Sequence, residues 1–144
     1  PEGEGTLISA DGNSIYPPVV VLEMNQILLQ ISTRDFSFVA EPHLSDIFKK
    51  FADVRVKVNM MQNSAISFSA CITNQADKVD RLLASLRDQF KVDADDDLEL
   101  LTIRHYNDSI LHELKRNRII ILEEKLSDTV QMITKRVPQL KMKD

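Results

Sequence analysis

Cysteine and glycine are scarce in this chain of 144 residues. Its single cysteine, Cys71, cannot form an intramolecular disulfide, and no CxxC motif or Cys/His cluster offers a structural metal site. The three glycines, Gly3, Gly5 and Gly12, all lie within the first dozen residues. No glycine-rich loop can therefore cradle a nucleotide phosphate in the body of the chain. We expect no disulfide, no metal and no nucleotide cofactor in this segment.

Long apolar runs and an excess of basic charge are also missing. No stretch of about 18 apolar residues could form a membrane-spanning helix, and the start PEGEGTLIS has neither the basic nor the apolar part of a signal peptide. The net charge is −4 and no basic stripe is sustained, so nucleic acid and anionic membrane are poor partners. We expect a cytoplasmic protein for which a small neutral or zwitterionic ligand remains possible.

The composition, 43% hydrophobic and 28% charged, fits one large globular domain or two small ones. Residues 1–18 contain every glycine, three of the five prolines and the turn-forming sequence Asp11-Gly12-Asn13. We interpret them as a lead-in from an upstream segment.

The first half of the body predicts strands, a helix and a hairpin. Two β-rich runs, 19–24 and 27–32, flank a turn-like Asn25-Gln26. A helix follows Pro42, because apolar residues recur there at helical spacing. They are Leu44, Ile47, Phe48 and Phe51.

Period-two alternation then predicts two strands of a hairpin, 54–60 and 66–72, separated by Gln62-Asn63. In the second strand Ile66 and Phe68 would face inward, while Ser69 and Cys71 would lie on the exposed face. The hairpin should pack its apolar face on the preceding helix.

A second helix should begin at Gln75, capped by Asn74, with an apolar side that includes Leu82 and Leu86. The acidic run 93–97 reads as a solvated turn rather than a magnesium site.

The order of elements then repeats. A strand at 98–104, a short helix capped by Asp108 and strands at 118–122 and 129–134 follow. The sequence LLQIS at 28–32 is echoed by LLTIR at 100–104, so the chain is an internal duplication with a spacing of roughly 70 residues. The second copy lacks a closing helix, because 137–144 is short and contains Pro138. The spare strand 19–24 could complete its sheet, which would make the first unit an insertion in the second.

The hairpin sequence Val58-Asn59-Met60-Met61-Gln62-Asn63-Ser64, followed by Ala65-Ile66-Ser67-Phe68-Ser69, resembles the effector-binding hairpin of aspartate kinases. The resemblance spans roughly residues 3–136. It implies an α+β fold of two ferredoxin-like βαββαβ ACT domains, with antiparallel sheets that carry helices on one face and with the first unit inserted in the second. The first domain would be 26–96, the second would combine 19–25 with 97–136, and 137–144 would be a tail.

The resemblance also implies a function. The chain would be the regulatory part of an aspartate kinase, with no catalytic site of its own. Lysine or threonine, or both, would bind it and inhibit the phosphorylation of aspartate at the head of lysine, threonine and methionine synthesis. ATP and magnesium would belong only to an upstream kinase domain, and the regulatory parts would form a homodimer through their ACT domains.

An amino-acid effector needs donors for its carboxylate and acceptors for its ammonium group. At the start of the helix the backbone N–H groups of His43 and Leu44 could receive the carboxylate. On the hairpin, Asn59 beside Val58 could accept from the ammonium group. The remaining polar contacts would come from Gln62, Asn63 and Ser64. The family often has aspartate at position 59 and an acidic residue at position 65, so charge-assisted recognition should be weaker here.

The loop before the helix adds possible contacts from Phe36, Ser37 and Phe38, although the two phenylalanines are better explained by packing or dimer contact. Arg104-His105-Tyr106 ends a strand at the equivalent place in the second unit, where a structural strand end is the simpler interpretation. A ferredoxin-like RNA-binding module would need exposed aromatic residues and a basic sheet face, which are not seen. A free-standing tandem ACT module, unattached to a kinase, stays open.

Overall fold

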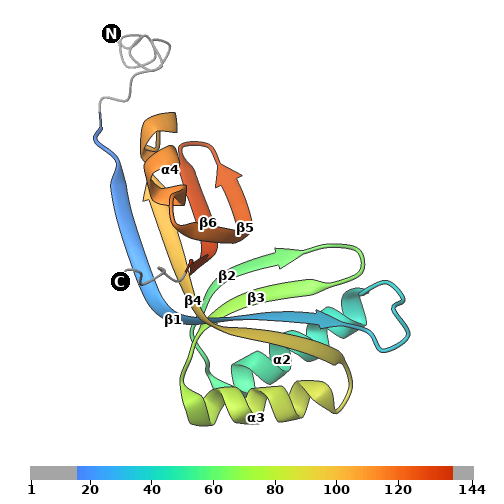
Figure 1. Cartoon of the computed structure of the whole chain (residues 1–144). Coiled ribbons are helices and arrows are strands. Elements are labelled where there is room, and N and C mark those ends of the chain that lie inside the picture. Colours follow the sequence, from blue (N-terminus) through green and yellow to red (C-terminus); the bar gives the residue numbers. More distant parts are fainter. Residues whose placement is uncertain (1–15, 138–144) are drawn as a thin grey trace, which may run out of the picture. The chain divides into compact units, whose positions relative to one another are not determined.

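The computed structural model describes residues 16–137. The lead-in predicted at 1–18 and the tail predicted at 137–144 therefore lie mostly outside the described residues. The described chain is α+β, with six strands that form one sheet in the order β2-β3-β1-β4-β6-β5 (Figure 1). The β1/β3, β2/β3 and β5/β6 pairs are antiparallel.

The chain divides into two compact units. The inserted unit is Met24–Glu99, and the split unit combines the chain up to Glu23 with the chain from Leu100 onward. Two strands of 14 residues, β1 (Val19–Ser32) and β4 (Lys91–Arg104), contribute to both units.

The inserted unit packs two helices on one sheet face (Figure 1). The helices are α2 (Glu41–Val54) and α3 (Ala76–Arg87), and β2 (Val58–Asn63) and β3 (Phe68–Thr73) form the hairpin. Alternate residues of β1 and β3 enter the same core as the helices, because successive side chains of a strand point to opposite faces. This core contains Ile27, Leu29, Ile31, Ile47, Phe51, Phe68, Ala70, Ile72, Val79, Leu82 and Leu86.

The split unit has a smaller core. The amphipathic helix α4 (Asp108–Lys115) packs Leu111 against strand residues that include Leu101 and Val130. Its hairpin is formed by β5 (Arg118–Leu126) and β6 (Thr129–Arg136). Among the described residues of this unit, α4 is the one helix.

Two predicted turns are wrong. Asn25-Gln26 does not end a strand, because β1 continues through it with Asn25 at φ 58°. The acidic run 93–97 is part of β4, which begins at Lys91 and contains Asp97 at φ 60°. Asn and Asp adopt this left-handed conformation more easily than other residues with a Cβ atom, so each bends a strand without ending it.

Other local predictions need correction. The chain at Val54 still belongs to α2, and the helix ends through Arg55 at φ 63°, so the hairpin strand begins only at Val58. Ile66 lies in the hairpin turn and is exposed, whereas Ser69 and Cys71 are buried. Ile66 precedes β3, which begins at Phe68, so the period of two does not extend to it.

The predicted helix caps are each displaced by one residue. The N-cap of α3 is Gln75 rather than Asn74, without a side-chain cap bond. The N-cap of α4 is Asn107 rather than Asp108, and its Oδ1 accepts from the backbone N–H of Ile110 at 2.8 Å.

Candidate functional site

A backbone hydrogen bond joins the loop before α2 to the turn of the β2–β3 hairpin. The N–H of Val39 donates to the carbonyl oxygen of Ala65 at 2.8 Å. We call this region the loop–hairpin junction; it comprises the loop 33–40, the first turn of α2 and the hairpin turn 64–67. It brings the helix start that the sequence analysis singled out next to the end of the hairpin.

The start of α2 has an unusual cap. Its N-cap is Ala40, which has no side-chain oxygen to accept from the helix N–H groups. Instead, His43 Nδ1 accepts from the Ala40 N–H at 2.9 Å. The Leu44 N–H donates to the Ala40 carbonyl at 3.1 Å. The prediction that Leu44 offers a free donor is therefore wrong, since this bond is the first of the helix. No described residue accepts from the His43 N–H.

The hairpin turn is closed by its two serines. The Ser64 N–H donates to the carbonyl oxygen of Ser67 at 2.9 Å, and the hydroxyl groups of the two residues lie 3.1 Å apart. The side chains of Gln62 and Asn63, at the end of β2, make no hydrogen bond with any described residue. The junction therefore brings the hairpin turn, which contains Ser64, next to the loop before α2, and Gln62 and Asn63 come directly before that turn at the end of β2.

Asn59 lies elsewhere. The register of β2 on β3 shifts between Val58 and Met60, and a bulge of this kind re-aims a side chain. Asn59 Nδ2 donates to Gln26 Oε1 at 2.8 Å and to Thr73 Oγ1 at 2.9 Å. Gln26 and Thr73 are register partners next to the Ile27/Ile72 pair of the core, so they lie on the sheet face opposite the helices.

The distance along β2 also separates Asn59 from the hairpin turn. From Asn59 to Ser64 the strand covers roughly 15 Å of extended chain. Val58, half-buried, packs against the core beneath the helices. The structure thus divides the predicted site into a group at the junction and a separate Asn59 group.

Gln26, a residue that the sequence analysis assigned to a turn, organises the Asn59 group. It is 1% exposed. Its Nε2 donates to the Met24 carbonyl at 3.1 Å and to Thr73 Oγ1 at 3.3 Å, while its Oε1 accepts from Asn59 and from the Cys71 thiol, the latter at 3.3 Å. The amide pair Asn25-Gln26 inside a run of strand-forming residues was the signal in the sequence for this buried network.

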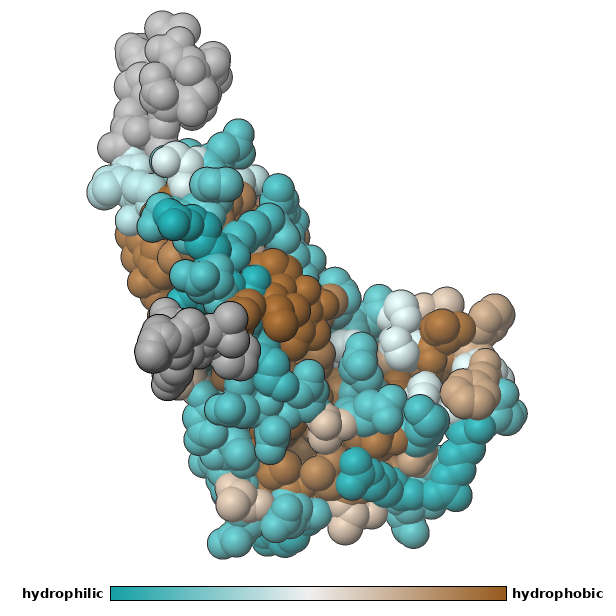
Figure 2. All heavy atoms as spheres, viewed as in Figure 1, coloured by the Kyte–Doolittle hydropathy of each residue, from teal (hydrophilic) through white to brown (hydrophobic). Residues whose placement is uncertain are grey.

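The loop at the junction is itself ordered by hydrogen bonds. Thr33 Oγ1 donates to the Ser37 carbonyl at 2.9 Å, and the Ser37 N–H donates to Asp35 Oδ1 at 3.1 Å. Hydrogen bonds from Ser37, and then from Thr33, lower the pKa of the Asp35 carboxyl group. Phe36 and Phe38 remain 68% and 71% exposed. Figure 2 shows hydrophobic side chains at the surface over this end of the inserted unit.

The split unit has a comparable contact between its strand–helix loop and its hairpin turn, but with a different chemistry. The His105 N–H donates to the Asp128 carbonyl at 2.7 Å, and His105 Nδ1 lies 2.7 Å from Asp128 Oδ2. The ring of Tyr16 stacks on His105 with centroids 4.8 Å apart. A hydrogen bond from Thr129, and then the charge of His105, lower the pKa of the Asp128 carboxyl group. In this unit the polar side chains of His105, Asp128 and Thr129 pair with one another.

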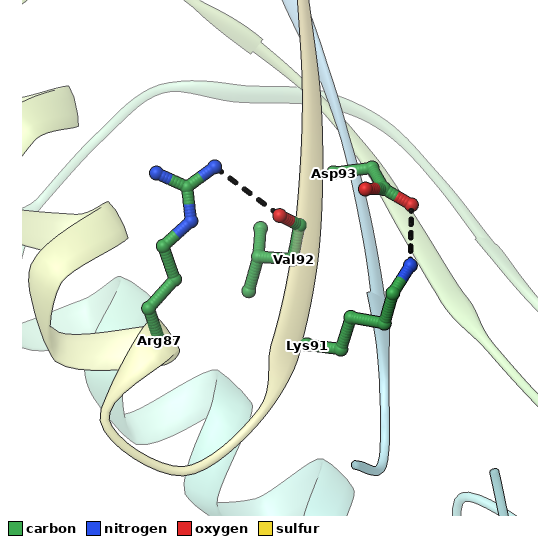
Figure 3. Close-up of polar contacts among 4 residues, drawn as sticks. All are labelled: Arg87, Lys91, Val92 and Asp93. Carbon is green, nitrogen blue, oxygen red and sulfur yellow. Dashed lines mark hydrogen bonds and ion pairs between the residues drawn. The ribbon is translucent and has the colours of Figure 1, made fainter.

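Figure 3 shows how the acidic run begins. Lys91 Nζ lies 3.2 Å from Asp93 Oδ2, and Arg87 donates from Nη2 to the Val92 carbonyl at 3.2 Å. These contacts fix the connection from α3 into β4. Within residues 16–137, no group of three or more His, Cys, Asp or Glu side chains is arranged to hold a metal ion. None of the helices described is long and apolar enough to cross a membrane.

Sequence comparison identifies no relative, since the chain matches no model of a protein family and no curated protein. Solved structures do match. The arrangement of strands and helices matches that of regulatory domains and subunits in solved structures. Specifically, the chain has the fold of the C-terminal regulatory region of aspartate kinases, as the resemblance of its hairpin sequence predicted.

Three of the matches illustrate the likeness. Aspartate kinase from Clostridium acetobutylicum gives a TM-score of 0.65 at 12% identity, covering 82% of this chain and 30% of that one. Aspartokinase III of E. coli, solved with lysine and aspartate in its T-state, gives 0.60 at 18% identity, covering 83% and 31%. The ligand-free regulatory subunit of aspartate kinase from Thermus thermophilus gives 0.58 at 9% identity, covering 82% and 87%. The chain thus spans about a third of the whole kinases and most of the separate regulatory subunit.

Proposed function

We propose that this chain is the amino-acid-sensing regulatory part of an aspartate kinase, composed of two ACT domains that correspond to the inserted and split units. It acts by allosteric feedback: lysine or threonine binds to it and inhibits the phosphorylation of aspartate by the kinase domain. The fold supports the regulatory role, and the complex of E. coli aspartokinase III with lysine supports the choice of ligand class. The chain itself contributes binding and no catalysis.

The observation that carries this proposal is the hydrogen bond from Val39 to Ala65. It holds a helix start whose N-cap residue provides no side-chain acceptor, and whose dipole favours a carboxylate by about 0.3 to 1 kcal/mol, beside the polar end of a hairpin. We place the effector at this loop–hairpin junction. The His43 N–H would receive the carboxylate. The side-chain oxygens of Gln62, Asn63 or Ser64 would accept from the ammonium group.

Inhibition requires only that the effector bind one state of the enzyme better than the other. A coupling free energy of about 1 to 3 kcal/mol would change activity roughly 5- to 150-fold. The partners that this mechanism needs are the kinase domain and a second copy of the chain. Two copies would meet along the edge strand β2.

Calorimetric titration of the chain with lysine and with threonine tests the proposal. One of them should bind saturably, and Asn63→Ala should weaken that binding by about 1 to 3 kcal/mol if a buried hydrogen bond to the ligand is lost. Asn74→Ala is the matched control, because Asn74 lies beyond the other end of the hairpin. Binding of neither amino acid to the native chain would overturn the proposal, and an unchanged affinity of Asn63→Ala would remove Asn63 from the site.

A further inference from the structure

The short connection between α3 and β4 lies against the start of α2, where the effector site is proposed. It consists of residues 88–90, between the end of α3 and the start of β4. The backbone N–H groups of Gln89 and Phe90 both donate to the Leu86 carbonyl, at 3.1 and 2.8 Å. The connection is therefore folded onto the last turn of α3, which holds its backbone.

Two polar contacts join this segment to the loop and the helix of the proposed site. Gln89 Nε2 donates to Asp46 Oδ2, on α2, at 2.9 Å. Arg34 Nη2, in the loop before α2, donates to the carbonyl oxygen of Arg87 at the end of α3. Both bonds are exposed, and water competes for the same groups, so each contributes little by itself. A firmer hold requires a buried contact.

Phe90 supplies that buried contact, to His43. Its side chain is 3% exposed and belongs to the core of the inserted unit. The rings of Phe90 and His43 are edge to face, with centroids 6.1 Å apart and an interplanar angle of 79°. This arrangement is favourable because the edge of one ring carries a partial positive charge and the face of the other a partial negative charge. The contact restricts the orientation of the His43 ring.

The orientation of this ring matters because His43 caps α2. The N-cap residue Ala40 has no side-chain acceptor, and His43 Nδ1 accepts from the Ala40 N–H at 2.9 Å. The lone pair of an imidazole nitrogen lies in the plane of the ring, so a rotated ring would lose this bond. An accepting Nδ1 also requires the proton of the neutral ring to be on Nε2. The His43 N–H that faces the proposed effector belongs to the same turn.

We propose that Phe90 is a positioning residue of the effector site. It acts without touching the effector: Phe90 orients the His43 ring, and the ring holds the Ala40 N–H. The turn formed in this way directs the His43 N–H toward the carboxylate of the amino acid. The inference rests on the proposed function for the ligand, whereas the effect of Phe90 on the cap is a property of the chain without ligand.

The variant Phe90→Leu, followed by NMR of the ligand-free chain at about pH 8, where an imidazole is neutral, tests the effect on the cap. Leucine keeps an apolar side chain in the core but removes the aromatic edge. We expect the imidazole nitrogen signals of His43 to show more of the tautomer protonated at Nδ1. The Ala40 amide should exchange with solvent about two- to tenfold faster, the change to which the loss of such an aromatic pair corresponds.

Phe51→Leu is the matched control. Phe51 belongs to the same core, is 6% exposed and makes an edge-to-face contact with Phe68 rather than with His43. This variant should lose a similar amount of stability in urea denaturation but keep the native His43 tautomer and the native exchange of Ala40. The proposal is overturned if both variants change the His43 signals equally, or if neither does.

The native chain allows a check that needs no substitution and so does not depend on the folding of a variant. Ring protons of Phe90 and His43 should show nuclear Overhauser cross-peaks, because their rings are in edge-to-face contact. Absence of these cross-peaks in the folded native chain would overturn the proposal.

Effector binding separates this inference from the proposed function. Whichever of lysine and threonine binds the native chain should bind Phe90→Leu about two- to tenfold more weakly, and Phe51→Leu with nearly native affinity. Equal affinities of the native chain and Phe90→Leu would overturn the positioning role and leave the proposed function standing. Binding of neither amino acid to the native chain would overturn the proposed function, while the His43 signals would still decide whether Phe90 holds the cap.

Discussion

The orientation of the Gln26 side-chain amide determines whether the side chain at position 59 must donate or accept a hydrogen bond. The carbonyl oxygen of Met24 can only accept a hydrogen bond, so it selects Nε2 of Gln26 as its neighbour and turns Oε1 toward position 59. A donor is therefore required there, and Asn59 supplies it with Nδ2. No buried side-chain oxygen among the described residues lacks a partner. Asn59 Oδ1 accepts no hydrogen bond from them, so it must reach solvent.

The variant Asn59→Asp tests whether the orientation of Gln26 requires a hydrogen-bond donor at position 59. An aspartate would put a carboxylate oxygen against Gln26 Oε1, where Asn59 Nδ2 now lies at 2.8 Å. Loss of the two donated bonds should lower the free energy of unfolding by about 1 to 3 kcal/mol at pH 7, measured by urea denaturation. Asn63→Asp adds the same charge at the exposed end of β2 and should cost less. Equal stabilities of the native chain and Asn59→Asp would show that Gln26 does not fix this position.

Asp128 makes the stability of the split unit depend on pH in the acidic range. Its pKa is lowered from 3.8 in the folded chain, first by the hydrogen bond from Thr129 and then by His105. A carboxyl group with a lowered folded pKa stabilises the fold above its unfolded pKa, and this contribution is lost as the pH falls through the folded value. The stability advantage of the native chain over Asp128→Asn should therefore be present at pH 5 to 7 and shrink below about pH 3.8.

Thermal unfolding of both proteins across this pH range measures the difference. Other carboxyl groups titrate in both proteins and cancel. Thr129→Val should move the pKa of Asp128 back toward 3.8, as followed by NMR of its carboxyl carbon. A difference between the native chain and Asp128→Asn that grows on acidification would contradict the assignment.

At the scale of the elements, the two strand–helix junctions use the same backbone contact with opposite consequences. In each, a loop N–H donates to a carbonyl oxygen of the hairpin turn: Val39 to Ala65 in the inserted unit and His105 to Asp128 in the split unit. In the split unit Asn107 caps α4 and Asp128 pairs with His105. The inserted unit has Ala40 at its N-cap, and this contrast supports placing the effector there.

Sequence patterns predicted the helices and the hairpins well because each has a strong apolar period. Leu44, Ile47 and Phe51 of the α2 stripe and the inward positions Phe68, Ala70 and Ile72 reach the core. Phe48, predicted in the same stripe, is 45% exposed. At Asn25 and Asp97 local polarity predicted turns, but each of these residues bends a long strand that its hydrogen-bonded neighbours in the sheet keep intact.

The candidate site was predictable only in part, for a different reason. The place of Gln62, Asn63 and Ser64 at the end of a hairpin was predictable from the alternating pattern. Their role in binding comes from the resemblance to aspartate kinases and stays a prediction. The position of Asn59 depends on a bulge and on the orientation of a glutamine 33 residues away in the sequence. Neither feature has a periodic signal, so a pattern of residues along one strand could not reveal them.

At the scale of the whole molecule, the two edges of the sheet differ in a way that bears on assembly. Proteins protect exposed edge strands with charged residues or proline. The edge strand β5 follows this rule with Arg118, Glu123, Glu124 and Lys125. The other edge strand, β2, has the sequence VNMMQN, without charge or proline. Met61 on β2 is 49% exposed, and Phe48 on α2 is 45% exposed. The unprotected edge supports the proposed homodimer through β2.

Met61→Lys should dissociate this dimer. A lysine at the edge would place a charge where two copies meet. It would also remove the burial of a methionine side chain, which stabilises the contact by about 1.5 to 3 kcal/mol. Together these effects should weaken association about tenfold or more. Sedimentation equilibrium over a range of concentrations measures the change. Ile119→Lys makes a like change at an exposed residue of β5 and should leave the dimer intact. If Ile119→Lys rather than Met61→Lys yields monomers, or if the native chain is monomeric at every concentration, then β2 is not the contact between copies.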